Sequence, residues 1–151
     1  MGEAKATWTS GKQFVIHSGT GHAIVTDAQP MVGGEDSGMS PMEMILGGLA
    51  GCTGIDVVYL LTDKMRQNLT GLRVEVDGQR AEDLPKVYTD IEVVYHVRGS
   101  DLDTKKVVRA LRMSEEKLCS VSAMLRHTAT IRSRYVIEDV HGGETIEGTL
   151  D

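Results

Sequence analysis

The sequence predicts an α+β fold in which a mainly antiparallel sheet packs on one long central helix. Strands and helices come in blocks along the chain and do not alternate as βαβ units. One stretch, residues 40–68, has helical periodicity and is apolar over its first two thirds. With 151 residues, 40% of them hydrophobic and 25% charged, the chain has the size and composition of one globular domain, which we expect to cover residues 1–151.

Three short strands are predicted before the long helix. Their polarity alternates over residues 3–9, 13–17 and 22–27, and a Ser-Gly-Thr-Gly turn joins the second strand to the third. The stretch 28–39 is rich in glycine and acidic residues and is expected to be a loop that leads into the helix.

The start of the central helix is marked by a capping box. Ser40 is a favourable N-cap, Pro41 fits the first helical position, and Glu43 follows Ser40 by three residues. The helix is apolar around much of its girth, which is typical of a helix buried in a core or against a partner subunit. Its apolar run is interrupted by glycine and charge, and we expect it to be too short to span a membrane.

A cysteine lies near the middle of this helix. Helical spacing places it on one stripe with four other residues: Ile45, Leu49, Cys52, Asp56 and Tyr59. Four glycines surround it: Gly47, Gly48, Gly51 and Gly54. Each glycine costs a helix about 1 kcal/mol relative to alanine, so their presence indicates close approach of another helix, or of a substrate that reaches the thiol.

The rest of the chain alternates between strands and helices in larger blocks. The predicted elements are strands over 72–79 and 87–97, a helix over 104–117 capped by Asp103, a short helix over 120–126 and a strand over 128–138. The helix stripe comprises Val107, Val108, Leu111 and Leu118. An acidic, glycine-containing tail over residues 141–151 ends the chain.

Composition and charge limit which classes of partner are expected. A net charge of −6 argues against nucleic acid, and the absence of a signal peptide or transmembrane run favours a cytoplasmic location without membrane contact. The five histidines are scattered without ligand spacing, and neither cysteine has zinc-ligand spacing. We therefore expect no cofactor and no metal.

The two cysteines, Cys52 and Cys119, are the candidate chemical groups. In a cytoplasmic protein such a pair is usually two inert buried thiols or a redox pair, and a purely structural disulfide is less common. The segments SPMEMILGGLAGCTGIDVV and EEKLCSVSAML around them resemble the OsmC/Ohr family, and within it the YhfA-like branch. The resemblance covers roughly residues 3–139 and leaves the tail outside.

This resemblance implies an intertwined homodimer whose central helices pack together, with active sites at the subunit interface. It also implies reduction of organic hydroperoxides, in which Cys52 is the peroxidatic cysteine and Cys119 resolves its sulfenic acid. A thiol reductant, which the sequence does not identify, would recycle the disulfide.

The chain departs from the pattern of the better-known peroxidases at three positions. Met42 stands where that pattern has a glutamate, and Glu43 follows one residue later. No arginine precedes Arg66, which leaves Lys12 as the cation nearest to the family's arginine position. Ser120 replaces a proline after the second cysteine. The candidate catalytic residues are therefore Cys52, Cys119, Glu43 and Lys12.

The chemistry of a thiol peroxidase requires a thiolate, and mid-helix placement gives Cys52 no help from a helix terminus. Cys119 is expected at the start of a short helix, where unpaired amides favour its thiolate. Asp56, one turn beyond Cys52, is expected to be a buried cap or an ion-pair partner in preference to an acid–base residue. Arg126 is expected on the surface, although it could neighbour Cys119.

Two further functions compete with the peroxidase. A non-catalytic, dimeric OsmC-like protein could bind a small molecule or sense redox state near Cys52, and the missing early arginine favours this alternative. A cysteine-dependent acyl-transfer enzyme with a histidine base is a weaker hypothesis, because no local signature supports it.

Overall fold

The computed structural model describes residues 2–150. These residues form two compact units, which divide between Ile45 and Leu46. The first unit holds the N-terminal sheet and the start of the long helix. The second holds the rest of that helix, the larger sheet and the remaining helices.

The first unit contains a three-stranded antiparallel sheet in the order β1-β2-β3. Its strands, β1 (Ala4–Ser10), β2 (Gln13–Ser18) and β3 (Ala23–Thr26), match the predicted ones closely. The loop after β3 includes the 3₁₀ turn η1 (Pro30–Val32). Asp27 anchors it by accepting hydrogen bonds from the Ser37 hydroxyl at 2.7 Å and from the backbone amide of Glu35 at 3.1 Å. These bonds, led by the Ser37 hydroxyl, lower the pKa of Asp27.

The long helix consists of α1 (Pro41–Tyr59) and the π-helical turn η2 (Leu60–Lys64). The predicted capping box is confirmed, since the Ser40 amide donates to Glu43 at 2.7 Å and the Glu43 amide donates to the Ser40 hydroxyl at 3.3 Å. The helix ends four residues earlier than predicted because Arg66 adopts a positive φ of 53° and β4 starts at Asn68.

Contrary to the expectation from the sequence, the helix over 41–64 is long and apolar enough to cross a membrane by length and composition alone. Its mean hydropathy is 1.8 over an 18-residue window, of which 28% is buried. Core helices of soluble proteins meet the same criterion, and this helix packs on a sheet: Gly54 lies against Val74 of β4.

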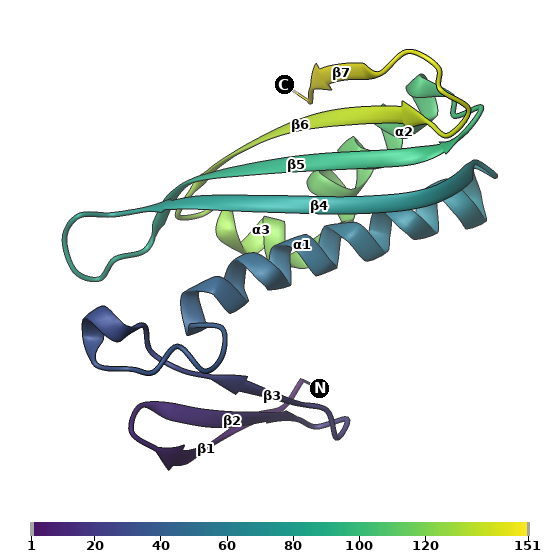
Figure 1. Ribbon diagram of the computed structural model, residues 1–151. Helices are drawn as coiled ribbons and strands as arrows, with labels where there is room; N and C mark the ends of the chain where they lie inside the picture. The colour runs from purple at the N-terminus through teal and green to yellow at the C-terminus, as the bar shows by residue number, and fades with distance from the viewer. Residues whose placement is uncertain (1, 151) are drawn as a thin grey trace. The chain divides into compact units, whose positions relative to one another are not determined.

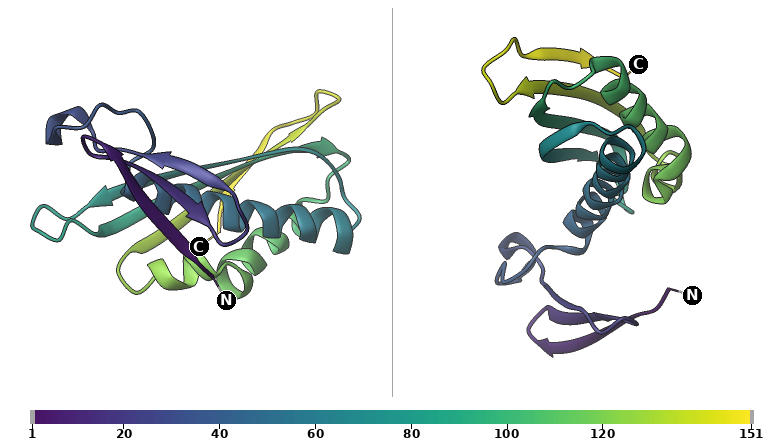
Figure 2. Two further views of the ribbon diagram at one scale, coloured as in Figure 1. Left: turned by 90° about the horizontal axis from the view of Figure 1, so that it is seen from below. Right: turned by 90° about the vertical axis from the view of Figure 1, so that its right-hand side faces the viewer.

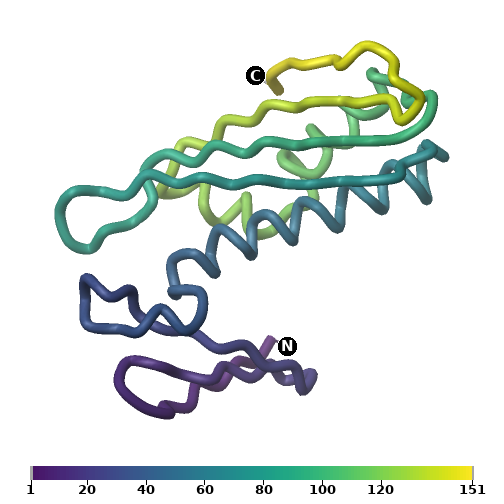
Figure 3. Tube along the Cα trace, in the orientation of Figure 1, coloured from purple at the N-terminus to yellow at the C-terminus, as the bar shows by residue number. Residues whose placement is uncertain are grey.

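A four-stranded sheet in the order β4-β5-β6-β7 forms the main layer of the second unit (Figure 1). Its strands are β4 (Asn68–Arg80), β5 (Tyr88–Ser100), β6 (Thr130–Asp139) and β7 (Ile146–Thr149). The tube in Figure 3 shows β4 and β5 as one long antiparallel hairpin. They approach closely at Gly78, where a Cβ atom would lie 2.5 Å from the ring of Tyr88.

Helices cover one face of this sheet, as both views in Figure 2 show. The connection from β5 to β6 contains α2 (Thr104–Met113), the π-helical turn η3 (Ser114–Leu118) and α3 (Ser120–Leu125). Asp103 caps α2 as predicted, accepting from the Lys105 amide at 2.9 Å. The core draws most on the central strand β5, where Ile91, Val93 and Tyr95 are at most 2% exposed.

Two features of the second sheet differ from the sequence-based expectation. β5 and β6 pair in parallel, because the helical connection returns the chain to the end at which β5 began. The tail also contains a strand, β7, which pairs antiparallel with β6. The segment IEGT is too short and too polar to show strand periodicity, and Gly148 is needed where Tyr135 packs against its backbone.

Candidate functional site

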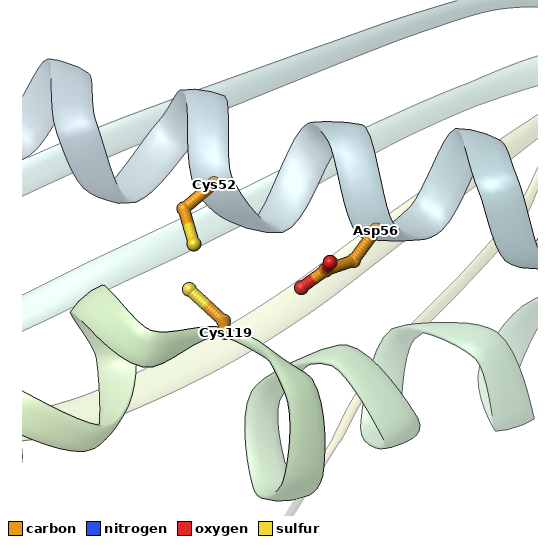
Figure 4. A group of neighbouring side chains, drawn as sticks. All are labelled: Cys52, Asp56 and Cys119. Carbon is orange, nitrogen blue, oxygen red and sulfur yellow. The ribbon is translucent and has the colours of Figure 1, made fainter. Parts of the chain in front are cut away.

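The structure brings Cys52 and Cys119 together, as Figure 4 shows. Cys52 projects from the middle of α1 and is half-buried, whereas Cys119 lies between η3 and α3 and is 2% exposed. Both are free thiols. Their sulfur atoms and a carboxylate oxygen of Asp56 all lie within 4.8 Å of one another. Asp56 follows Cys52 by one helical turn, so both side chains point to the same side of α1 (Figure 4).

Backbone geometry fixes the position of Cys119. Its own φ of −67° and ψ of 103° are extended, and it is the N-cap residue of α3. The amide of Ser122 donates to its Sγ atom at 3.3 Å. The preceding turn is π-helical, and its last hydrogen bond runs from the Cys119 amide to the Ser114 carbonyl at 2.8 Å.

Burial raises the pKa of the Cys119 thiol to about 11. The Ser122 amide lowers it, and the neighbouring Cys52 raises it further. The expectation that the start of a short helix favours the Cys119 thiolate is therefore wrong in its net effect: the amide acts in the expected direction, but loss of solvent outweighs it. Cys119 is a protonated thiol at neutral pH.

A chain of buried hydroxyl groups begins at Asp56. The Ser114 hydroxyl donates to Asp56 Oδ2 at 3.1 Å and lies 2.7 Å from the hydroxyl of Thr53. Thr53, adjacent to Cys52 in sequence, lies 2.8 Å from the phenol of Tyr95. These three hydroxyl-bearing residues are at most 1% exposed. The chain thus connects α1 to η3 and to the central strand of the sheet.

This chain of hydroxyl groups ends at a second carboxylate, that of Glu115. Tyr95 donates to Glu115 Oε1 at 3.0 Å, and Arg126 pairs with Glu115 Oε2 at 3.7 Å. Burial, followed by the charge of Glu115, raises the pKa of Tyr95, so its phenol stays protonated and acts as a donor. Arg126 Nε also donates to the Ser122 hydroxyl at 3.2 Å. Arg126 is exposed, as expected from the sequence, and it also contacts Glu115 and Ser122.

The other two predicted site residues, Lys12 and Glu43, belong to the first unit. Lys12 donates a hydrogen bond from Nζ to the Val32 carbonyl. Glu43 is engaged in the capping box, and its bonds with Ser40, first from the side chain and then from the backbone, lower its pKa. Their catalytic roles stay predictions.

Several residues of the site were missed from the sequence: Thr53, Tyr95, Ser114 and Glu115. One available signal was Asp56 itself, a carboxylate on an otherwise apolar stripe that needs buried donors. The hydroxyl partners come from three separate segments, and no spacing rule in one sequence connects them.

Among residues 2–150, Cys52, Asp56 and Cys119 form a group whose possible metal-ligand atoms lie close together. Two thiolates and a carboxylate are ligands that zinc accepts. The group contains no histidine, and its sulfur atoms are equally suited to forming a disulfide.

A sheet backed by a long helix, with one of two neighbouring thiols on that helix, defines a small α+β protein with a cysteine pair. The sequence matches the family described as OsmC-like protein over residues 34–134. It is 36% identical to protein YhfA of Escherichia coli over 135 residues, which cover 89% of this chain and 97% of YhfA. The chain belongs to the OsmC-like family.

Solved structures agree with this assignment. A hypothetical protein from Aquifex aeolicus is 27% identical, with a TM-score of 0.80 over 92% of this chain and 97% of the other. An organic hydroperoxide resistance protein OsmC from Legionella pneumophila is 15% identical, with a TM-score of 0.66 over 91% and 96%. At that identity the second likeness shows the fold alone.

Proposed function

We propose that this protein reduces organic hydroperoxides, with Cys52 as the peroxidatic nucleophile and Cys119 as the resolving thiol. The observation that carries the proposal is the pair of free thiols from separate elements within 4.8 Å, one half-buried and one buried. Membership in the OsmC-like family supports a redox role for this pair. One protein that shares the fold is an organic hydroperoxide resistance protein, from which we take the proposed substrate class.

The reaction has two steps. The Cys52 thiolate attacks the terminal oxygen of the hydroperoxide, the O–O bond breaks, and the alcohol leaves with a proton while Cys52 becomes a sulfenic acid. Cys119 then attacks the oxidised sulfur, water leaves, and a disulfide forms. Two thiols and one hydroperoxide thus yield a disulfide, an alcohol and water, and an external thiol reductant returns the protein to its starting state.

The assembly we propose is a homodimer in the cytoplasm. α1 exposes Ile55 at 73% and Val58 at 41%, beside a groove of about 590 Å³ between α1 and β4. An apolar flank of this kind on a central helix is suited to burial against a second copy. Within that assembly we assign Lys12 as the cation that supports the Cys52 thiolate, and Glu43 as the acid that orients the start of the catalytic helix.

The direct test is oxidation of the reduced protein by one equivalent of cumene hydroperoxide, followed by intact-mass spectrometry and thiol titration. We expect the mass of two hydrogen atoms to be lost and both thiols to disappear in one step. A Cys52→Ser protein treated in the same way should keep its mass. Unchanged mass and two titratable thiols in the parent protein would exclude the peroxidase.

A non-catalytic redox sensor on the same fold is the second candidate. The observation that favours it is the pKa of Cys119, which at about 11 leaves little thiolate at neutral pH to resolve an oxidised Cys52. The two candidates differ in turnover: with excess dithiothreitol, a peroxidase consumes many equivalents of hydroperoxide per chain, whereas a sensor is oxidised once and reduced slowly.

A further inference from the structure

The hydroxyl chain beneath the cysteines has one proton fewer than it has hydrogen-bonding contacts. Four oxygen–oxygen contacts link Asp56, Ser114, Thr53, Tyr95 and Glu115. The three hydroxyl groups bring three protons. The Ser114 and Tyr95 protons are directed outward to the two carboxylates, so the single proton of Thr53 serves two neighbouring oxygens. One of its two contacts, at 2.7 and 2.8 Å, therefore has no proton between the oxygens.

Uptake of one proton at either end completes the chain. If Asp56 becomes protonated, it donates to Ser114, Ser114 donates to Thr53, and Thr53 donates to Tyr95, so that every contact becomes a hydrogen bond. Because these hydroxyls are buried, an unmade bond among them is costly and its completion is correspondingly favourable. The two ends differ, since Arg126 pairs with Glu115 and stabilises its negative charge. Of the two carboxylates, Asp56 is thus the one that can take up the additional proton.

We propose that Asp56 is the proton acceptor that ionises the Cys52 thiol, and that Ser114, Thr53 and Tyr95 act as a relay that stabilises the accepted proton. The Cys52 S–H bond breaks, the electron pair stays on sulfur as the thiolate, and the proton passes to Asp56. When the hydroperoxide O–O bond breaks, Asp56 returns this proton to the leaving alkoxide. This inference rests on the proposed role of Cys52 as the nucleophile.

The groups facing Asp56 are consistent with this role. On its own helix it faces Cys52, from η3 it meets Ser114 and, through the relay, Glu115, and Cys119 lies within the same 4.8 Å cluster. Arg126 is the cation closest to the relay by hydrogen-bonded connection, and it is bound to Glu115 and Ser122. Within residues 2–150, the ion pairs join other carboxylates, and none of them places a cation on Asp56 that would hold it as an anion.

The proposal makes a prediction opposite in sign to simple electrostatics. If Asp56 acted only as a fixed negative charge, its removal would favour the nearby thiolate. If Asp56 is the acceptor, its removal disfavours ionisation. The experiment follows the rate of Cys52 alkylation by iodoacetamide from pH 5 to 9 in a Cys119→Ser background, without peroxide, so that its result does not depend on peroxidase activity.

We expect Asp56→Asn to slow alkylation at pH 7 by about 100-fold, the lower end of the range for loss of a positioned acid–base group. Asp63→Asn, which removes an exposed carboxylate from η2 of the same helix, is the matched control and should leave the rate unchanged. Asp56→Glu keeps a carboxyl group and should recover part of the rate, which separates loss of the acceptor from misfolding.

Tyr95→Phe tests the relay at a distance from the sulfur atoms. Without the phenol, Thr53 is free to donate to Ser114, and Ser114 donates to Asp56. Both remaining contacts are then hydrogen bonds while Asp56 is ionised. The hydroxyl groups therefore no longer favour a proton on Asp56. We expect alkylation about fivefold slower at pH 7, the equivalent of one neutral hydrogen bond. A faster or unchanged rate in Asp56→Asn overturns Asp56 as the acceptor, and an unchanged rate in a folded Tyr95→Phe protein overturns the relay.

Discussion

The segment of α1 around Cys52 and the junction of η3 with α3 around Cys119 present the same side chain in opposite settings. Cys52 lies in mid-helix, half-buried, beside Gly51, where a Cβ atom would meet nothing within 4 Å. Cys119 is enclosed, lies at a helix start and accepts an amide hydrogen bond. Cys52 is the more accessible of the two thiols, and Cys119 is kept protonated by burial. The helix start, which alone favours a thiolate, thus matters less here than access to solvent.

The largest effect should come from replacing each of the two cysteines separately by serine. We expect Cys52→Ser to abolish hydroperoxide consumption, because the accessible nucleophile is gone. Cys119→Ser should consume one equivalent and stop at the sulfenic acid, because the resolving thiol is absent. A stopped-flow assay with dimedone trapping distinguishes these outcomes. Equal single-turnover activity of Cys52→Ser and the parent protein would remove Cys52 from the mechanism.

A second difference concerns the surfaces near the two thiols. Ile55 on α1 is 73% exposed, and Met124 on α3 is 64% exposed. If the α1 flank is the dimer interface, Ile55→Glu should weaken dimerisation by about 100-fold or more, because two copies of a buried apolar side chain are lost. Met124→Glu is the matched control and should have no effect.

Sedimentation at micromolar concentration measures both surface variants. The parent protein should sediment as a dimer, and a clean 16.4 kDa monomer of the parent would contradict the homodimer outright.

The enclosed setting of Cys119 predicts a steep pH dependence for the resolving step. Its pKa of about 11 lies above the working range, so its thiolate fraction rises with pH and does not level off before that value. Disulfide formation from Cys52 sulfenic acid should accelerate about tenfold per pH unit between pH 7 and 10. Quenched-flow mass spectrometry measures the rate. A flat profile would mean that Cys119 ionises far more readily than its burial implies.

The smallest effect is expected for Lys12, the cation assigned to the open thiol. Its ammonium group already binds the Val32 carbonyl and is exposed, so its contribution is limited. Lys12→Met should slow Cys52 alkylation at pH 7 by up to about fivefold, the range of an exposed charge interaction. Lys5→Met in β1 is the control. If both variants keep the parent rate, Lys12 has no part in activating Cys52.

Most of the fold could be predicted from local patterns. Capping boxes depend on neighbouring residues, so Ser40 and Asp103 marked helix starts that the structure confirms. Long-range pairing could not be predicted in the same way. The parallel register of β5 and β6 results from where the helical connection returns the chain, and β7 is too short to carry a strand pattern.

The site was predictable only in part, for the same reason. Two cysteines separated by 66 residues could be paired through resemblance to a family. The relay could not, because Thr53, Tyr95 and Ser114 meet only when α1, β5 and η3 pack together. The net effect of burial on Cys119 was also missed, since a sequence shows a helix start but not how much solvent reaches it.

The π-helical form of η3 has a consequence for how this chain can vary in length. Its wide turn accommodates one residue more than an α-turn, and both of its ends are fixed: Ser114 by the relay and Cys119 by the thiol pair. Deleting one residue between them would restore the α-turn and rotate the downstream residues by about 100° around the helix axis. The thiol would then face away from Cys52. The loop over residues 81–87 lies outside the relay and the thiol pair, so we expect insertions to be tolerated better there than in η3.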